Sequence, residues 1–408
     1  MNKQIIEAIE RSVAENNIQH LTLWLCASDE WIKLANSFGA SSCSIELAQL
    51  IENEHPKLSS SFFSVGGRGE RINAMYLAKW LVLRASLVGA EIAYSSLLAL
   101  ESSSEYTAYN LSLISGIDFR GKIELVDDIY FCDGINLPEE IKVNVDSIFE
   151  RLTRRNSFSS EIHPPYTFLF QPIKINLLSN EFKNETRETM INYVNKEMLI
   201  SNFLSLFSNN SAPCVELRWC ILEDSTPLSG IIDTGFTNYL DVIKPKHYDV
   251  WTDIDTAYVR GLFLKYLAIE EKRRLPLDIS LARRCQAMNT WNNVNKAIDL
   301  GIALESILTK PSNNGELTLQ IRIIGSKLIS SDISRRKEIS SLLKTIYNIR
   351  SSAVHEGFLK EKYSVCDRGK LNAGVILEEG FPVLRDCLVK IIEHGGLTDD
   401  DYEELFFS

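Results

Sequence analysis

Residues 332–357 read DISRRKEISSLLKTIYNIRSSAVHEG, and their apolar residues recur at the spacing of an amphipathic helix. Asp332 or Ser334 suits its N-cap, and Gly357 is a residue at which such a helix ends. The preceding segment has the same stripe, formed by Leu317, Ile321, Ile324 and Leu328. Short links between such segments favour antiparallel helices. The sequence therefore predicts an all-helical bundle over residues 276–396, without strands.

The chain before residue 276 follows other patterns. Residues 1–120 are mainly helical in character, with one long apolar helix expected from about Arg71 to Glu101. A helix is also expected from about Arg187 to Leu206. Alternation of apolar and polar residues indicates strands at Lys122–Val126, Asp128–Phe131, Tyr166–Phe170 and Cys214–Trp219. We therefore predict an α+β protein with a helical lobe (1–120), a strand-containing lobe (121–275), the all-α bundle and an acidic tail (397–408).

Composition places the chain among ordinary globular proteins. Its 408 residues are 45% hydrophobic and 24% charged, enough for two or three domains. Residues 1–7 end in the acid Glu7 and lack the apolar core of a secretion signal, and no uninterrupted stretch of about 20 apolar residues predicts a membrane span. The eight cysteines form no Cys-x-x-Cys pair. We expect reduced thiols, no zinc site and a cytoplasmic location.

Charge is unevenly distributed along the chain. The net charge is −11, but residues 282–360 hold twelve Lys or Arg and six Asp or Glu, a local excess of +6. The remainder therefore carries −17, and residues 399–404 alone hold five acids. A basic segment within an acidic protein favours local phosphate binding over general coating of nucleic acid. The alternative is a chance fluctuation of surface charge.

Arg350 and His355 suit the cleavage of RNA. An arginine is a permanent cation whose planar donors fit a phosphate, and a histidine exchanges protons near neutral pH. RNA supplies its own nucleophile, the 2′-hydroxyl, so neither a metal nor a cofactor is expected. Five helical residues advance about 500°, which leaves the two side chains about 140° apart. We therefore expect a homodimer in which two such pairs share a groove. From spacing alone, an ordinary pair at a helix end is the alternative.

The residues around this pair extend the argument. With Asp299–Glu305, the helix around Arg322 and Tyr347–Gly357, the region of about 280–395 resembles the HEPN domains, most closely the Apea-like group of bacterial proteins. The resemblance implies a dimerising bundle and a metal-independent ribonuclease in antiviral defence, abortive infection or toxin systems. It implies RNA as a partner, with a regulatory protein or phage component in control. Some such domains bind nucleic acid or a partner without cutting, which is the alternative function.

The resemblance also assigns roles to residues. Arg350 would hold the scissile phosphate, and His355 would be the acid and base. Ser351 occupies a position where the family often has Asn, Asp or His, so its part in the chemistry is in question. Asp299 and Glu305 are acids on an otherwise apolar helix, and buried acids need partners. Arg322 and Arg350 are candidates, in which case the acids orient the arginines; otherwise both are surface carboxylates.

Other motifs are weaker. Gly66–Gly69 could cradle a phosphate, but it lacks the Gly-Lys-Ser/Thr ending of a P-loop, and a turn is the simpler interpretation. Asp233–Gly235 has the Asp-Thr-Gly of aspartic proteases without the second aspartate that they need, which favours a turn. No metal-ligand spacing joins the remaining histidines, His20, His55, His163, His247 and His394.

Overall fold

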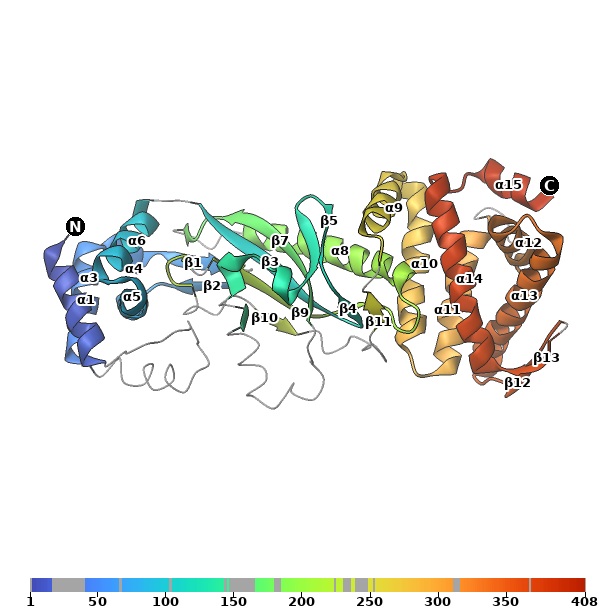
Figure 1. Ribbon diagram of the computed structural model, residues 1–408, viewed down its shortest axis with the longest axis horizontal. Helices are drawn as coiled ribbons and strands as arrows, with labels where there is room; N and C mark the ends of the chain where they lie inside the picture. The colour runs from blue at the N-terminus through green and yellow to red at the C-terminus, as the bar shows by residue number, and fades with distance from the viewer. Residues whose placement is uncertain are drawn as a thin grey trace. The chain divides into compact units, whose positions relative to one another are not determined.

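A computed structural model describes residues 2–16, 41–65, 68–102, 105–142, 145–146, 166–179, 185–223, 225–229, 236–238, 249–251, 254–310, 316–366 and 368–407 (Figure 1). The chain forms two compact units, each built from three separate segments. The first unit comprises Met1–Leu113, Asp128–Asn195 and Leu217–Asn238, and the second comprises Ile114–Asp127, Lys196–Glu216 and Tyr239–Ser408. The sequence suggested contiguous lobes instead. The α+β class, with strands before a helical C-terminal region, is confirmed.

The first unit begins with helices that pack around an apolar core. They are α1 (Lys3–Glu15), α3 (Ser42–Glu54), α4 (Pro56–Ser60), α5 (Ala74–Val88) and α6 (Ala90–Ser102). Helix α5 contacts α1, α3 and α6. Its side chains Leu77, Trp80 and Leu81 are fully buried, as is Leu97 of α6. A helix that is apolar nearly all round can be stable in water only when neighbours cover it in this way.

The single helix expected from Arg71 to Glu101 is wrong. Gly89 separates α5 from α6 and has a φ of +87°, a conformation that side chains rarely tolerate. Its N–H still donates to the carbonyl of Ala85 (2.9 Å), which closes the last turn of α5. The apolar pattern continues across the break because both helices face the same core. Periodicity alone therefore gave no sign of it.

The described strands before the helical bundle form three sheets, the smallest of which pairs β4 (Ile117–Phe119) with β11 (Asp249–Trp251) in parallel. A small sheet has the order β2-β1-β8, and a larger one has the order β10-β9-β3-β7-β6-β5. The strands are β1 (Phe62–Val65), β2 (Arg68–Arg71), β3 (Tyr106–Ser115), β5 (Lys122–Val126), β6 (Ile129–Asp133), β7 (Thr167–Ile175), β8 (Leu178–Ser179), β9 (Cys214–Leu222) and β10 (Phe236–Asn238). Strands β6 and β7 are antiparallel, and Tyr130 opposite Phe170 stacks its ring at 4.9 Å. The four predicted strands and helix α8 (Glu185–Leu204) are confirmed.

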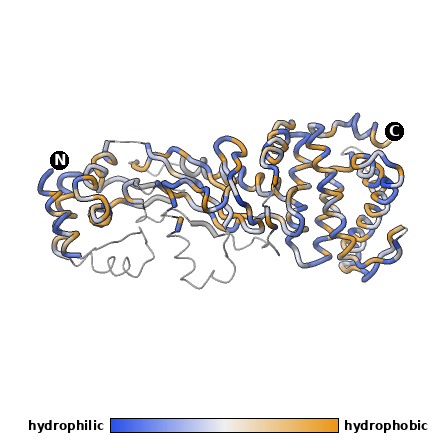
Figure 2. The backbone as a smooth tube through the Cα atoms, in the orientation of Figure 1, coloured by the Kyte–Doolittle hydropathy of each residue, from blue (hydrophilic) through white to orange (hydrophobic). Residues whose placement is uncertain are grey.

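The second unit contains the helical bundle. Its helices are α9 (Thr256–Ala268), α10 (Glu271–Asn289), α11 (Asn293–Leu308), α12 (Leu317–Ile329), α13 (Ile333–Glu356), α14 (Ala373–His394) and α15 (Asp399–Phe407). Helix α11 packs against α10, α12, α13 and α14 and is therefore central in the bundle. Hydrophobic and hydrophilic stripes alternate along these helices (Figure 2). The buried stripes include Leu300, Leu304, Ile321, Leu343, Ile346 and Leu384.

The bundle departs from the prediction at one place. Strands β12 (Lys362–Val365) and β13 (Gly369–Asn372) form an antiparallel hairpin between α13 and α14, where no strand was expected. Four-residue strands with one lysine each carry too little alternation to be recognised. The expected acidic tail forms α15, and the hydroxyl of Tyr402 donates to the carbonyl of Ile307 (2.9 Å). No described helix is both long and apolar enough to span a membrane.

Candidate functional site

Helix α13 carries Arg350 and His355, and its ends and buried face fix both positions. Asp332 caps its N-terminus by accepting from the N–H of Arg335 (2.7 Å), and Gly357 ends it with a φ of +74°. The buried face comprises Ile339, Leu342, Leu343, Ile346, Ile349 and Ala353. The helix is unbroken over its 24 residues. The expected angle of about 140° between the two side chains therefore applies, with about 7.5 Å between them along the axis.

Arg350 lies against helix α11. A Cβ added to Gly301 would be only 2.3 Å from Cγ of Arg350, so the missing side chain provides the space for the arginine. Nη2 of Arg350 donates to Oε2 of Glu305 (3.2 Å), one helical turn beyond Gly301. The Arg350 side chain is 23% exposed. Its stem and charge are therefore both positioned by the same face of α11.

Two further features describe the surroundings of the Arg350 guanidinium. Its Cζ lies 5.6 Å from the centre of the Tyr347 ring, within the range of a cation–π contact. Its Nε is buried and has no hydrogen-bond partner in the described part of the chain. An unpaired buried donor costs roughly 1–3 kcal/mol. Arg350 is thus a fixed cation with hydrogen-bonding capacity that its neighbours leave unused.

His355 has different surroundings. It lies in the last turn of α13 and is exposed, and no hydrogen bond or ion pair engages it among the described residues. Its neighbours Val354 and Phe358 are 48% and 59% exposed. Ser351 is half-buried. The imidazole is therefore accessible to a ligand, and apolar side chains flank it.

The remaining predicted residues do not join this pair. Asp299 forms an ion pair with Arg283 of α10 (2.9 Å), which the sequence did not suggest. Nε of Arg322 donates to Ser340 of α13 (3.2 Å) and links two helices. Of the pairings considered, the structure brings together only Glu305 and Arg350. Gly301 and Glu305 lie one helical turn apart, as do Tyr347 and Arg350. These two spacings are the signals in the sequence from which the other contacts of Arg350 could have been predicted.

Asp299→Asn is expected to remove a loss of unfolding free energy that the wild-type chain shows as the pH rises. Burial raises the pKa of Asp299 above its ordinary 3.8, despite the opposing effect of Arg283. A group whose pKa is higher in the folded state stabilises the fold fully below its unfolded pKa, and this contribution is lost as the pH rises through the folded pKa. Relative to Asp299→Asn, the wild-type chain should lose unfolding free energy between about pH 4 and neutrality. Urea unfolding of both chains at several pH values measures this, and an opposite trend contradicts it.

The other motifs contribute nothing to this cluster. Gly66, Gly67 and Asp233–Gly235 lie outside the described residues, as do His20, His163 and His247. Buried His55 contacts Glu101 (2.8 Å) and Tyr94 (3.1 Å), and Nδ1 of His394 lies 2.9 Å from the carbonyl oxygen of Gly396. The described residues contain no metal-binding group of three His, Cys, Asp or Glu. Their seven cysteines are free thiols.

No family model, no curated protein and no solved structure matches the chain.

Proposed function

We propose that residues 276–396 form an HEPN domain of the Apea-like group that cleaves RNA without a metal ion. The observation that carries the proposal is the end of α13, where Arg350, held by Glu305, precedes the exposed His355. The local charge of +6 supports binding of a polyanion. We propose cytoplasmic antiviral defence or abortive infection as its setting. An unrestrained ribonuclease is toxic to its own cell, so a regulatory protein or phage component would control it.

The chemistry needs only groups that RNA and the protein supply. The 2′-oxygen attacks the adjacent phosphorus, so an O2′–P bond forms while the P–O5′ bond breaks. One imidazole accepts the proton of the 2′-hydroxyl, and a second donates a proton to the departing O5′. The products are a 2′,3′-cyclic phosphate and a 5′-hydroxyl, and no water is consumed. Arg350 stabilises the charge that develops on the phosphate oxygens.

Glu305 acts as a positioning residue in this proposal. Its carboxylate neutralises Arg350 before RNA binds and keeps the guanidinium at the surface of α11. Both side chains are about one-quarter exposed, so a phosphate can approach the same guanidinium. An arginine has five N–H donors, enough to engage a carboxylate and a phosphate at once. The buried Nε has no partner among the described residues, and a phosphate oxygen reached by a small movement would satisfy it.

A homodimer completes the proposed site. One Arg350 and one His355 about 140° apart do not surround a phosphate, whereas two pairs across a two-fold axis supply two cations and two imidazoles. Val354 and Phe358 beside His355 are exposed apolar side chains. Apolar surface of this kind is suited to contact with a second copy. We therefore propose that the bundles meet around the ends of their α13 helices.

The test is cleavage of a short single-stranded RNA by the purified chain in the presence of EDTA. We expect products that end in a 2′,3′-cyclic phosphate and a 5′-hydroxyl, identified by mass spectrometry. An RNA of the same sequence with one 2′-deoxynucleotide should resist cleavage at that linkage only, because the nucleophile is missing. Light scattering in the same buffer should show a dimer wherever cleavage is observed.

Three results would contradict this proposal. Cleavage that requires added divalent metal rules out the mechanism, and cleavage at the 2′-deoxy linkage rules out 2′-hydroxyl attack. A fully active monomer rules out the shared groove. Tight RNA binding without products would instead favour the alternative, a non-catalytic module that binds nucleic acid or a protein partner.

A further inference from the structure

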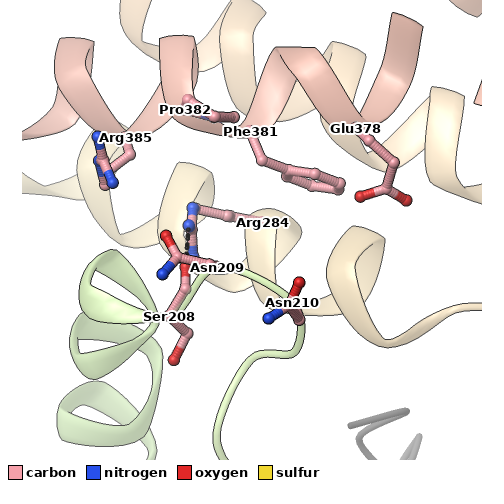
Figure 3. Close-up of a pocket in the computed structure, with 8 residues that line it drawn as sticks. All are labelled: Ser208, Asn209, Asn210, Arg284, Glu378, Phe381, Pro382 and Arg385. Carbon is pink, nitrogen blue, oxygen red and sulfur yellow. Dashed lines mark hydrogen bonds between the residues drawn. The ribbon is translucent and has the colours of Figure 1, made fainter. Parts of the chain in front are cut away.

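A cavity of about 410 Å³ in the second unit is lined by none of the residues discussed above. Its walls come from α10, α14 and the segment after α8, and they include Ser208, Asn209, Asn210, Arg284, Phe381 and Arg385 (Figure 3). A volume of this size accommodates a small organic molecule. The question is which chemistry the cavity would recognise.

Arg284 dominates the cavity because it is a buried cation, and Asp249 attracts its charge without forming an ion pair with it. The residue is 1% exposed, and no ion pair joins it to an acid in the described part of the chain. Its Nη1 donates to the carbonyl of Ser205 and its Nη2 to that of Ser208 (3.1 Å). Its Nε is buried and unpartnered within the same part. Burial lowers the pKa of Arg284 to about 10, so the guanidinium stays charged at neutral pH.

A second cation lines the same cavity. Arg385 of α14 donates from Nε and Nη2 to a single oxygen of its neighbour Asp386 (3.1 and 2.9 Å), which leaves its other donors for a ligand. The charge of Arg385 contributes to the lowered pKa of Arg284. The two guanidinium groups therefore repel each other across the cavity, and an anion between them would relieve that repulsion.

The nearby acids are already engaged. Asp249 accepts from the backbone N–H groups of Asn209 (2.8 Å) and Asn210 (3.0 Å) and thereby fixes this wall. Glu378 also lines the cavity, but Lys296 donates to its carboxylate. Figure 3 shows the side chain of Asn209 beside Arg284 and the Phe381 ring along another wall. The cavity thus combines a cationic end with an apolar wall of Phe381 and Pro382.

We propose that this cavity binds a small organic phosphate, with the phosphate between Arg284 and Arg385 and the organic part against Phe381 and Pro382. Arginine is suited to this role because its planar donors match the oxygens of a phosphate. A structural role for Arg284 as a cap of the Ser205 and Ser208 carbonyls accounts for two of its contacts. It does not account for the unpartnered Nε, for the second arginine or for the cavity that both residues line.

Calorimetric titration of the full chain tests the proposal with adenosine monophosphate, inorganic phosphate and adenosine as probes. We expect adenosine monophosphate to bind most tightly and adenosine not to bind. Arg385→Ala should weaken the binding of adenosine monophosphate by about tenfold, the loss of one charge-assisted contact. Arg385 is partly exposed, so its removal should leave the fold intact. The matched control is Arg335→Ala, an exposed arginine of α13 that pairs with Glu338 and lies outside the cavity lining.

The outcomes separate clearly. Binding of adenosine monophosphate that Arg385→Ala weakens and Arg335→Ala does not supports the assignment, and Arg284→Lys should weaken it as well. Absence of binding to the folded wild-type chain at millimolar concentration overturns it. So does binding that Arg385→Ala leaves unchanged, or equal binding of adenosine and adenosine monophosphate. None of these readouts depends on cleavage of RNA, so the experiment tests the cavity independently of the proposed ribonuclease site.

Discussion

His355→Ala is expected to slow the cleavage of RNA by about a hundredfold to ten-thousandfold, the usual contribution of a general acid or base. The side chain is exposed and engages no other described residue through a hydrogen bond or ion pair, so its removal should leave the fold unchanged. The rate constant is measured on a labelled RNA under single-turnover conditions, with EDTA present. Circular dichroism and thermal unfolding of the variant should match those of the wild-type chain.

His394 provides a matched control for this experiment. It also lies in the last turn of a helix, α14, with 56% of its side chain exposed. His394→Ala removes the same chemical group from the last turn of another helix, together with its contacts to Gly396 and Asp401, and we expect it to cleave RNA at the wild-type rate. If both variants retain activity, His355 takes no part in the chemistry. If both lose it equally, the effect comes from the ends of the bundle and not from a catalytic imidazole.

The periodicity of apolar residues predicted helices well where one face is buried. Helix α13 ends at Gly357 as expected, because apolar residues recur along its buried face and glycine readily adopts a φ of +74°. The pattern reports which face is buried but not where the backbone changes direction. Gly89 therefore went unnoticed within an apolar stretch. The charged hairpin after α13 escaped recognition for a related reason, since its short strands bury little.

The candidate site shows the same limit. Arg350 was one of two arginines named as candidate partners for Asp299 and Glu305, and in the structure it pairs with Glu305. Asp299 instead pairs with Arg283 of α10. The apolar periodicity of the sequence does not reveal which helices lie next to each other. The cavity at Arg284 and Arg385 was not foreseen at all. Its residues are 101 positions apart in the sequence, and only the packing of α10 against neighbouring elements makes one of these arginines a buried charge.

Gly301→Ala is expected to reduce the cleavage of RNA by about a hundredfold, because a displacement of about 1 Å in a catalytic group can have an effect of this size. The new Cβ would lie 2.3 Å from Cγ and 2.9 Å from Cβ of Arg350, close to the backbone end of that side chain. Rotation of the far end cannot relieve this overlap, so the whole arginine must shift away from Glu305. Such overpacking should lower the free energy of unfolding by about 1–3 kcal/mol, less the gain in helix propensity.

Gly261→Ala is the matched control, since Gly261 lies within α9 and an added Cβ would meet nothing within 4 Å. This variant should keep full activity and gain up to about 1 kcal/mol of stability. A double-mutant cycle then isolates the contact: in an Arg350→Ala background, Gly301→Ala should be much less destabilising, because Cγ and Cδ of Arg350 are gone and only the contact with Cβ at 2.9 Å remains. If Gly301→Ala lowers stability equally in both backgrounds, the overlap with Arg350 is not the cause. If it leaves cleavage unchanged, the position of Arg350 against α11 does not matter for function. The Gly301→Ala variant thus tests whether the packing of Arg350 against α11 is needed for the cleavage of RNA.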